Sequence, residues 1–143
     1  MDNDILGGEI IPTSLIVPTG EKIRAEFHVW KSAPDNPAHV QLGLHFGTTK
    51  ITVVATNFFA AMCAIRRGIE TIQLRLNCYG ASRNVQASPM PFILDKGEKV
   101  FRLKLGEEAQ TSGIVSIFDT GTDVDPVTFD EQQAFFEAWK RSI

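Results

Sequence analysis

Histidines and a tryptophan gather on one face of two predicted strands near the N-terminus. In residues 23–30, and again in residues 39–46, apolar and polar side chains alternate, which is typical of half-buried strands. Imidazole nitrogen is a common zinc ligand in proteins. An exposed tryptophan among polar groups also suits protein contacts, because aromatic residues and arginine supply much interface energy. The predicted outward side chains are Arg24, Glu26, His28, Trp30, His39, Gln41 and His45.

The pairing of these two strands decides which histidines meet. Because the strands are adjacent in sequence, we expect a hairpin with residues 31–38 as its loop. His28 and His39 are then diagonal neighbours, whereas His45 lies on the order of 20 Å from His39 along an extended strand. One metal ion does not reach all three histidines in that register, so we predict a recognition surface and no metal site. The predicted opposite pairs are Trp30 with His39, His28 with Gln41, and Arg24 with His45.

A second chemically suggestive string lies near the C-terminus, where residues 117–122 are Ile-Phe-Asp-Thr-Gly-Thr. The string resembles the Asp-Thr-Gly signature of aspartic proteases, including the two preceding apolar residues. The resemblance implies that Asp119 is a catalytic carboxylate sharing a proton with a second aspartate, which a homodimer partner supplies in retroviral-type enzymes. In that family a flap and a supporting apolar segment follow the signature, whereas here a helix is predicted after it. The alternative is a strand end followed by a glycine turn.

Acidic residues cluster around the same turn, at Asp119, Asp123, Asp125 and Glu131. A calcium-binding EF-hand loop needs glycine at position 6 and glutamate at position 12. Counted from Asp119, position 6 is Val124 and position 12 is Asp130, so the EF-hand spacing fails. We expect solvated loop carboxylates and a helix cap here, with an irregular cation site as the alternative.

A third candidate surface is the connection formed by residues 81–91, which contains two prolines and Arg83. Long irregular connections are uncommon in small domains and often carry function. The strand predicted just before it, residues 72–79, points Arg75 and Tyr79 outward and Cys78 inward. We therefore expect Arg75, Tyr79 and Arg83 to form a site for an anion or an acidic peptide. A packed or mobile loop is the alternative.

Two helices are predicted. Asn57 is the expected N-cap of the first, which runs to about Arg67 and stops at Gly68. Arg66 and Arg67 fall in its last turn, where positive charge complements the helix dipole, with an anion site as the alternative. The second begins at a capping box, Thr128 to Glu131. Its apolar stripe, which we expect in the core, consists of Phe129, Phe136, Trp139 and Ile143.

The remaining strands complete an α+β pattern. Residues 15–17 lie between prolines, so a short edge strand is expected there. The β-branched run 50–56 predicts a central strand. Residues 92–105 predict a hairpin and residues 114–118 a further strand. The sum is about six or seven mostly antiparallel strands with one central and one C-terminal helix, in a single α+β domain over residues 1–143.

Composition narrows the classes of protein further. The formal charge of −3 makes nucleic acid an unlikely partner, since such binders normally carry a basic surplus. Cys63 and Cys78 have apolar neighbours, and we expect buried, reduced thiols. The acidic N-terminus does not suit a signal peptide, and no apolar run approaches the ~20 residues that span a bilayer. A cytoplasmic location is therefore expected, with no membrane association.

No complete catalytic or cofactor motif is present in the sequence. We therefore expect no cofactor, and the sequence favours a protein without enzyme activity over an enzyme. The leading hypothesis is a protein-binding module, such as an adaptor, an inhibitor or an immunity-type protein, that uses the face around His28 and Trp30. A small hydrolase acting through Asp119, and a small-ligand carrier, are the alternatives. The hairpin face could also be covered by a helix or simply solvated, and a homodimer is compatible with an open edge strand.

Overall fold

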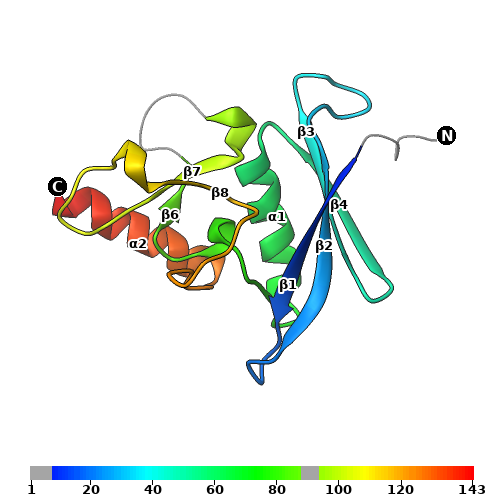
Figure 1. The fold of residues 1–143 in the computed structure, drawn as a ribbon, viewed down its shortest axis with the longest axis horizontal. Coiled ribbons are helices and arrows are strands. Elements are labelled where there is room, and N and C mark those ends of the chain that lie inside the picture. The colour runs from blue at the N-terminus through cyan, green and yellow to red at the C-terminus, as the bar shows by residue number, and fades with distance from the viewer. Residues whose placement is uncertain (1–7, 88–93) are drawn as a thin grey trace.

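The computed structural model describes residues 8–87 and 94–143. Its eight strands form two antiparallel sheets, one five-stranded in the order β4-β3-β2-β1-β5 and one three-stranded in the order β6-β7-β8 (Figure 1). The strands are β1 (Glu9–Ile16), β2 (Lys22–Trp30), β3 (Val40–Phe46), β4 (Thr49–Ala55), β5 (Arg75–Leu76), β6 (Val85–Gln86), β7 (Lys99–Arg102) and β8 (Ile114–Ser116). The helices are α1 (Phe58–Glu70) and α2 (Phe129–Ser142). The predicted single α+β domain with a central and a C-terminal helix is confirmed, with more strands than expected.

The main core lies between the five-stranded sheet and α1. Alternation in β2 and β3 is confirmed, because their inward side chains are buried while their outward neighbours stay accessible. The exceptions are Ile23, which is 39% exposed at the start of β2, Gly43, which is buried although it faces outward, and Phe46, which is half-buried although it faces inward. Helix α1 turns its apolar side towards these strands. The inward residues of β2 and β3 and their partners on α1 are Ala25, Phe27, Val29, Val40, Leu42, Leu44, Phe58, Met62, Ile65 and Ile69.

Two strand positions differ from the prediction. β1 is eight residues long and lies between β2 and β5, not at an edge. Pro12 is tolerated within it because β5 pairs only with Leu15 and Ile16, so a missing N–H interrupts no second ladder at Pro12. The predicted central strand, β4, is instead the edge of the sheet, and Val54 is 51% exposed on its outward side. A β-branched run therefore did not require burial on both faces.

The beginning of α1 is as predicted and its end is not. The side chain of Asn57 accepts a hydrogen bond from the Ala60 amide at 2.8 Å, which confirms the N-cap. The helix continues past Gly68 to Glu70, and the chain then turns through Gln73 at a φ of 64°. That turn leaves Ile72 60% exposed and shortens the predicted strand 72–79 to the two residues of β5.

Helix α2 begins at the predicted capping box, with Thr128 and Glu131 bonded reciprocally. Its predicted stripe is only partly correct, since Trp139 is buried but Ile143 is 56% exposed. Gln132, which stands at helical spacing between Phe129 and Phe136, is fully buried although it is polar. In the part of the chain that the structure describes, neither helix is long and apolar enough to cross a membrane.

Gln132 is buried because it joins a polar network around Arg66. The Arg66 guanidinium is also buried, and it donates to the Gly80 carbonyl, to Gln132 Oε1 at 2.7 Å and to the Val127 carbonyl at 3.0 Å. The prediction that Arg66 lies in the last turn of α1 is wrong, because the helix continues to Glu70 and leaves only Arg67 there. Arg67 does lie in the exposed last turn, with its guanidinium 5.0 Å from the centre of the Phe129 ring.

Both cysteines are free, as predicted. Cys63 lies in α1, and Cys78 lies two residues after β5 with its thiol against Met62. Burial raises the pKa of Cys63 to about 11 and the pKa of Cys78 to about 12. Both thiols are therefore protonated at neutral pH, and neither is poised as a nucleophile.

Candidate functional site

The candidate site lies on the side of the five-stranded sheet that faces away from α1, here called the outer face. Figure 1 shows both helices and the three-stranded sheet on the opposite side. Because paired residues project from the same side of a sheet, the strand registers define the members of this face. The outer face consists of Ile10, Pro12, Ser14, Arg24, Glu26, His28, Trp30, Gln41, Gly43, His45, Lys50, Thr52 and Val54.

The predicted register of β2 and β3 is wrong by two positions. Trp30 lies opposite Gln41, and the next pairs are His28 with Gly43 and Glu26 with His45. The cause is the connection between the strands, where the Ala33 amide donates to the His39 carbonyl and so closes a wider loop. His39 therefore belongs to this loop, beside Asn36, and its predicted approach to His28 does not occur.

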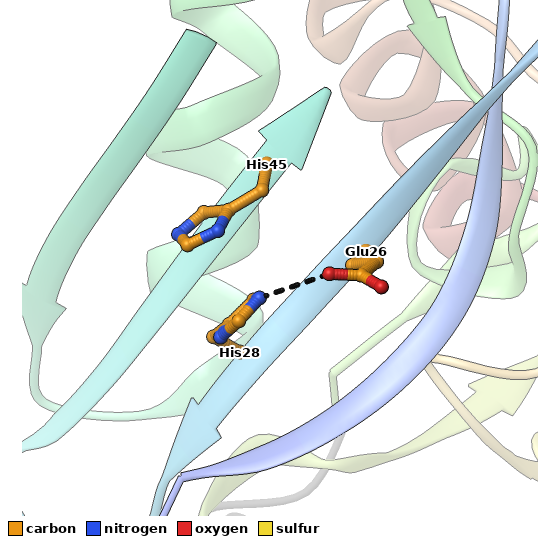
Figure 2. Close-up of side chains that lie close together, drawn as sticks. All are labelled: Glu26, His28 and His45. Carbon is orange, nitrogen blue, oxygen red and sulfur yellow. Dashed lines mark hydrogen bonds and ion pairs between the residues drawn. The ribbon is translucent and has the colours of Figure 1, made fainter. Parts of the chain in front are cut away.

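The true register brings His28 and His45 together. Their rings stack with centroids 3.8 Å apart and planes inclined by 24°. Glu26 completes the group, because its Oε1 lies 3.3 Å from His28 Nε2 (Figure 2). One ligand atom from each of the three side chains lies within 4.8 Å of the others. We call these three residues the His–Glu cluster.

Gly43 leaves room beside the two stacked rings. It lies directly opposite His28 and two residues before His45 on the same face. A Cβ at this position would lie 3.4 Å from His28 Cβ and 3.6 Å from His45 Nε2. The missing side chain thus leaves the space over which the His45 ring folds towards His28.

The electrostatics of the cluster keep His45 neutral. Burial is the main cause that lowers the pKa of His45 below 6.5, and the nearby His28 and Lys50 lower it further, while Glu26 opposes the shift. A neutral imidazole is the form that accepts hydrogen bonds and binds metals. At pH 7 His45 therefore presents a ring nitrogen with a free lone pair.

The lowered pKa of His45 predicts a pH-dependent stability. In the unfolded chain His45 binds a proton near pH 6.5, before the folded protein does, so acidification favours unfolding. We expect the free energy of unfolding to fall as the pH drops from 6.5 through the pKa of the folded protein, and to fall less in His45→Gln. Urea unfolding of both proteins between pH 8 and 5 measures this difference. A wild type that gains stability relative to the variant on acidification would contradict the assignment.

A shallow depression of about 580 Å³ lies beside the cluster, bordered by Glu26 and His45. Arg24 borders it too, and within the described residues the Arg24 guanidinium has no hydrogen-bond or ion-pair partner. Lys50 is likewise exposed and without such a partner among those residues. This end of the outer face is therefore electropositive, apart from Glu26.

The other predicted residues of the hairpin face lie near the cluster. The Trp30 ring centre is 6.2 Å from that of His28, and Gln41 is its cross-strand neighbour. An added Cβ at Gly8 would lie 2.7 Å from Trp30 Cε2, so a larger residue at position 8 would displace the indole ring. Four of the binding residues proposed from the sequence, Arg24, His28, Trp30 and Gln41, share the outer face with Glu26 and His45. The predicted register had left His45 away from His28.

The second predicted surface is not formed as expected. Tyr79 is buried, and its hydroxyl donates to Asp123, so it does not face outward. Arg83 is held by Asp125 at 2.8 Å, and Arg75 is exposed on β5. Both arginines lower the pKa of Glu131 electrostatically, after its larger hydrogen bonds to Thr128. Most of residues 81–87 are buried, and residues 88–91 lie outside the described part of the chain.

The acidic turn does not converge on a common centre. Asp123 contacts Tyr79 and Arg102, and Asp125 contacts Arg83, so their charges are already matched by protein groups. Glu131 serves as the helix cap. Within residues 8–87 and 94–143, the one group of metal-ligating side chains that gathers is the His–Glu cluster.

Asp119 is exposed and lies three residues after the end of β8, in the segment that leads into the acidic turn. Its backbone carbonyl accepts a hydrogen bond from the Tyr79 amide, and its amide donates to Ser116. An irregular segment and then α2 follow the Asp-Thr-Gly string, as the sequence predicts. The region thus has the arrangement of a strand end followed by a turn.

Comparison with known proteins adds no family to this description. No protein-family model matches the chain, and no curated protein matches its sequence. The function is therefore argued from the geometry of the outer face.

Proposed function

We propose that this domain is a binding module that contacts another protein through the outer face. The observation that carries the proposal is the division of this face into two unlike ends. One end exposes apolar side chains, with Ile10 54% and Val54 51% accessible. The other carries Arg24 and Lys50, which have no hydrogen-bond or ion-pair partner in the described chain.

These two ends define the chemistry of the partner. Exposed apolar side chains beside an aromatic residue gain most from burial against a complementary protein surface. Cations without partners favour acidic side chains on the facing surface and accelerate encounter at low ionic strength. The partner expected here places carboxylates near Arg24 and an apolar group against Val54. Binding should weaken as salt is raised, because the charged contacts lie at the surface.

The experiment is capture of partners from the native cell extract, followed by identification and binding assays with the purified partner. Val54→Lys and Arg24→Glu are expected to weaken binding about 10-fold or more. Ile72→Lys is the matched control, since Ile72 is similarly exposed at 60% but lies at the turn after α1, outside this face. Arg83→Ala tests the other predicted surface and should leave binding unchanged.

Partner binding that is unchanged in both Val54→Lys and Arg24→Glu would contradict the proposal. So would a loss of affinity in Ile72→Lys as large as the loss in these two variants. Self-association through the open edge of β4 is a separate outcome, which sedimentation velocity distinguishes.

A further inference from the structure

We propose that Glu26, His28 and His45 form a binding site for a divalent transition-metal ion. The inference does not rest on the outer face binding a protein. It starts from three potential ligands brought together from two strands, with the donor atoms within 4.8 Å of one another. Both strands are interior to the sheet, paired on each side, which fixes the backbone positions of the ligands.

The donor set indicates the class of metal. Two imidazole nitrogens and one carboxylate oxygen suit Zn²⁺, Fe²⁺, Co²⁺, Ni²⁺ and Cu²⁺, whereas Ca²⁺ and Mg²⁺ prefer oxygen ligands alone. Affinity within this group generally rises towards Cu²⁺ and falls again at Zn²⁺. Binding of transition-metal ions but not of Ca²⁺ or Mg²⁺ is therefore expected.

The distances suit tetrahedral coordination. Metal–ligand bonds of ~2.0–2.1 Å at tetrahedral angles place neighbouring ligand atoms about 3.3–3.4 Å apart. His28 Nε2 and Glu26 Oε1 are already 3.3 Å apart. The His45 ring stacks on His28 with centroids 3.8 Å apart and planes inclined by 24°. Because the lone pair of an imidazole nitrogen lies in the ring plane, the His45 ring has to rotate out of this stack for its nitrogen to point at the ion.

The charges around the cluster act in both directions. Glu26 supplies a negative charge, which favours binding of a cation. Lys50 on β4 and Arg24 on β2 add positive charge nearby, which weakens binding of a cation. Three protein ligands also leave a coordination position open. Because Glu26 and His45 border the depression that Arg24 lines, an anionic group or water from that side can complete the coordination.

The test is titration of the untagged, purified protein with Zn²⁺ by isothermal calorimetry, with Mg²⁺ and Ca²⁺ as comparison ions. One Zn²⁺ per chain is expected. Loss of an outer-shell partner of a metal ligand typically costs 10–100-fold in affinity, so His28→Ala and His45→Ala are expected to weaken binding by about 100-fold or more. His39→Ala is the matched control, because His39 lies in the loop and outside the cluster.

Gly43 supplies a second, independent pair of variants. A Cβ there would make only ordinary contacts, at 3.4–3.6 Å, so Gly43→Ala should bind Zn²⁺ like the wild type. The additional methyl groups of Gly43→Val extend into the space of the His45 ring and should weaken binding at least 10-fold. Circular dichroism confirms that each variant is folded.

The proposal would be overturned by the absence of saturable Zn²⁺ binding, by binding that His28→Ala and His45→Ala leave intact, or by an equal loss in His39→Ala. Folded Gly43→Val with unchanged affinity would overturn it as well. Because no partner protein is present in these titrations, their outcome is independent of the protein-binding proposal.

Discussion

Replacing Arg66 by methionine should lower the free energy of unfolding by about 3 kcal/mol. The substitution removes the donor that satisfies the Val127 carbonyl and Gln132 Oε1 inside the core. A buried acceptor left without a partner costs about 1–3 kcal/mol. The guanidinium's own desolvation penalty disappears at the same time, which keeps the net loss below the sum of the broken bonds. The Gly80 carbonyl retains a hydrogen bond from Gln132.

Urea unfolding followed by tryptophan fluorescence measures this loss. Arg67→Met is the matched control, since Arg67 is the next residue of α1 but is exposed against the Phe129 ring. A cation over an aromatic ring at an exposed site contributes about 0.5–1 kcal/mol. Equal losses in the two variants would show that the Arg66 network does not hold α1 and α2 together as described.

Replacing Gly97 by alanine should cost about 2–4 kcal/mol. Gly97 has a φ of 88°, which L-residues rarely adopt, and an added Cβ would lie 2.7 Å from Asn57 Oδ1. That oxygen caps α1 by accepting from the Ala60 amide. The Cβ would also lie 2.9 Å from the Phe59 amide nitrogen, a backbone atom that cannot rotate away. Backbone strain, overpacking and damage to the cap therefore act together.

Gly106 separates these contributions. Its φ of 83° is nearly the same, but nothing lies within 4 Å of an added Cβ. Gly106→Ala should therefore cost only the backbone strain, about 1 kcal/mol. Urea unfolding of both variants should show a difference of at least about 1 kcal/mol. Equal losses of unfolding free energy in the two variants would contradict the close approach of Gly97 to the start of α1.

Local pattern was enough to predict much of the fold. Alternation in β2 and β3, the Asn57 cap and the capping box at Thr128 are each decided by neighbouring residues, and each is confirmed. The burial of Arg66 was not predictable in this way. Its three acceptors come from the turn at Gly80, from Val127 and from α2, which only the tertiary fold brings to α1.

The candidate site shows the same division. The sequence placed His28 and His45 on one face, but the width of a single loop decided whether they meet. Because side chains alternate with a period of two, a register error of two positions preserves the face and changes every neighbour. A sequence signal was nevertheless present in the Glu26-x-His28 spacing and in Gly43, which precedes His45 by two residues and pairs with His28.

The outer face thus combines a recognition surface with a metal site at its centre, if both proposals hold. A metal ion on the His–Glu cluster would add positive charge beside Arg24 and Lys50. This addition would strengthen the attraction of the face for carboxylates on a partner. Measuring partner binding with and without one equivalent of Zn²⁺ would show whether the metal site and the recognition surface act together.

The most direct test of the account is an NMR titration of the imidazole nitrogens with Zn²⁺ at pH 7. The structure predicts that one equivalent shifts the ring signals of His28 and His45 together and leaves those of His39 unchanged. Joint movement of His28 and His39 would contradict the register, and no change in any ring up to one equivalent would contradict the metal site.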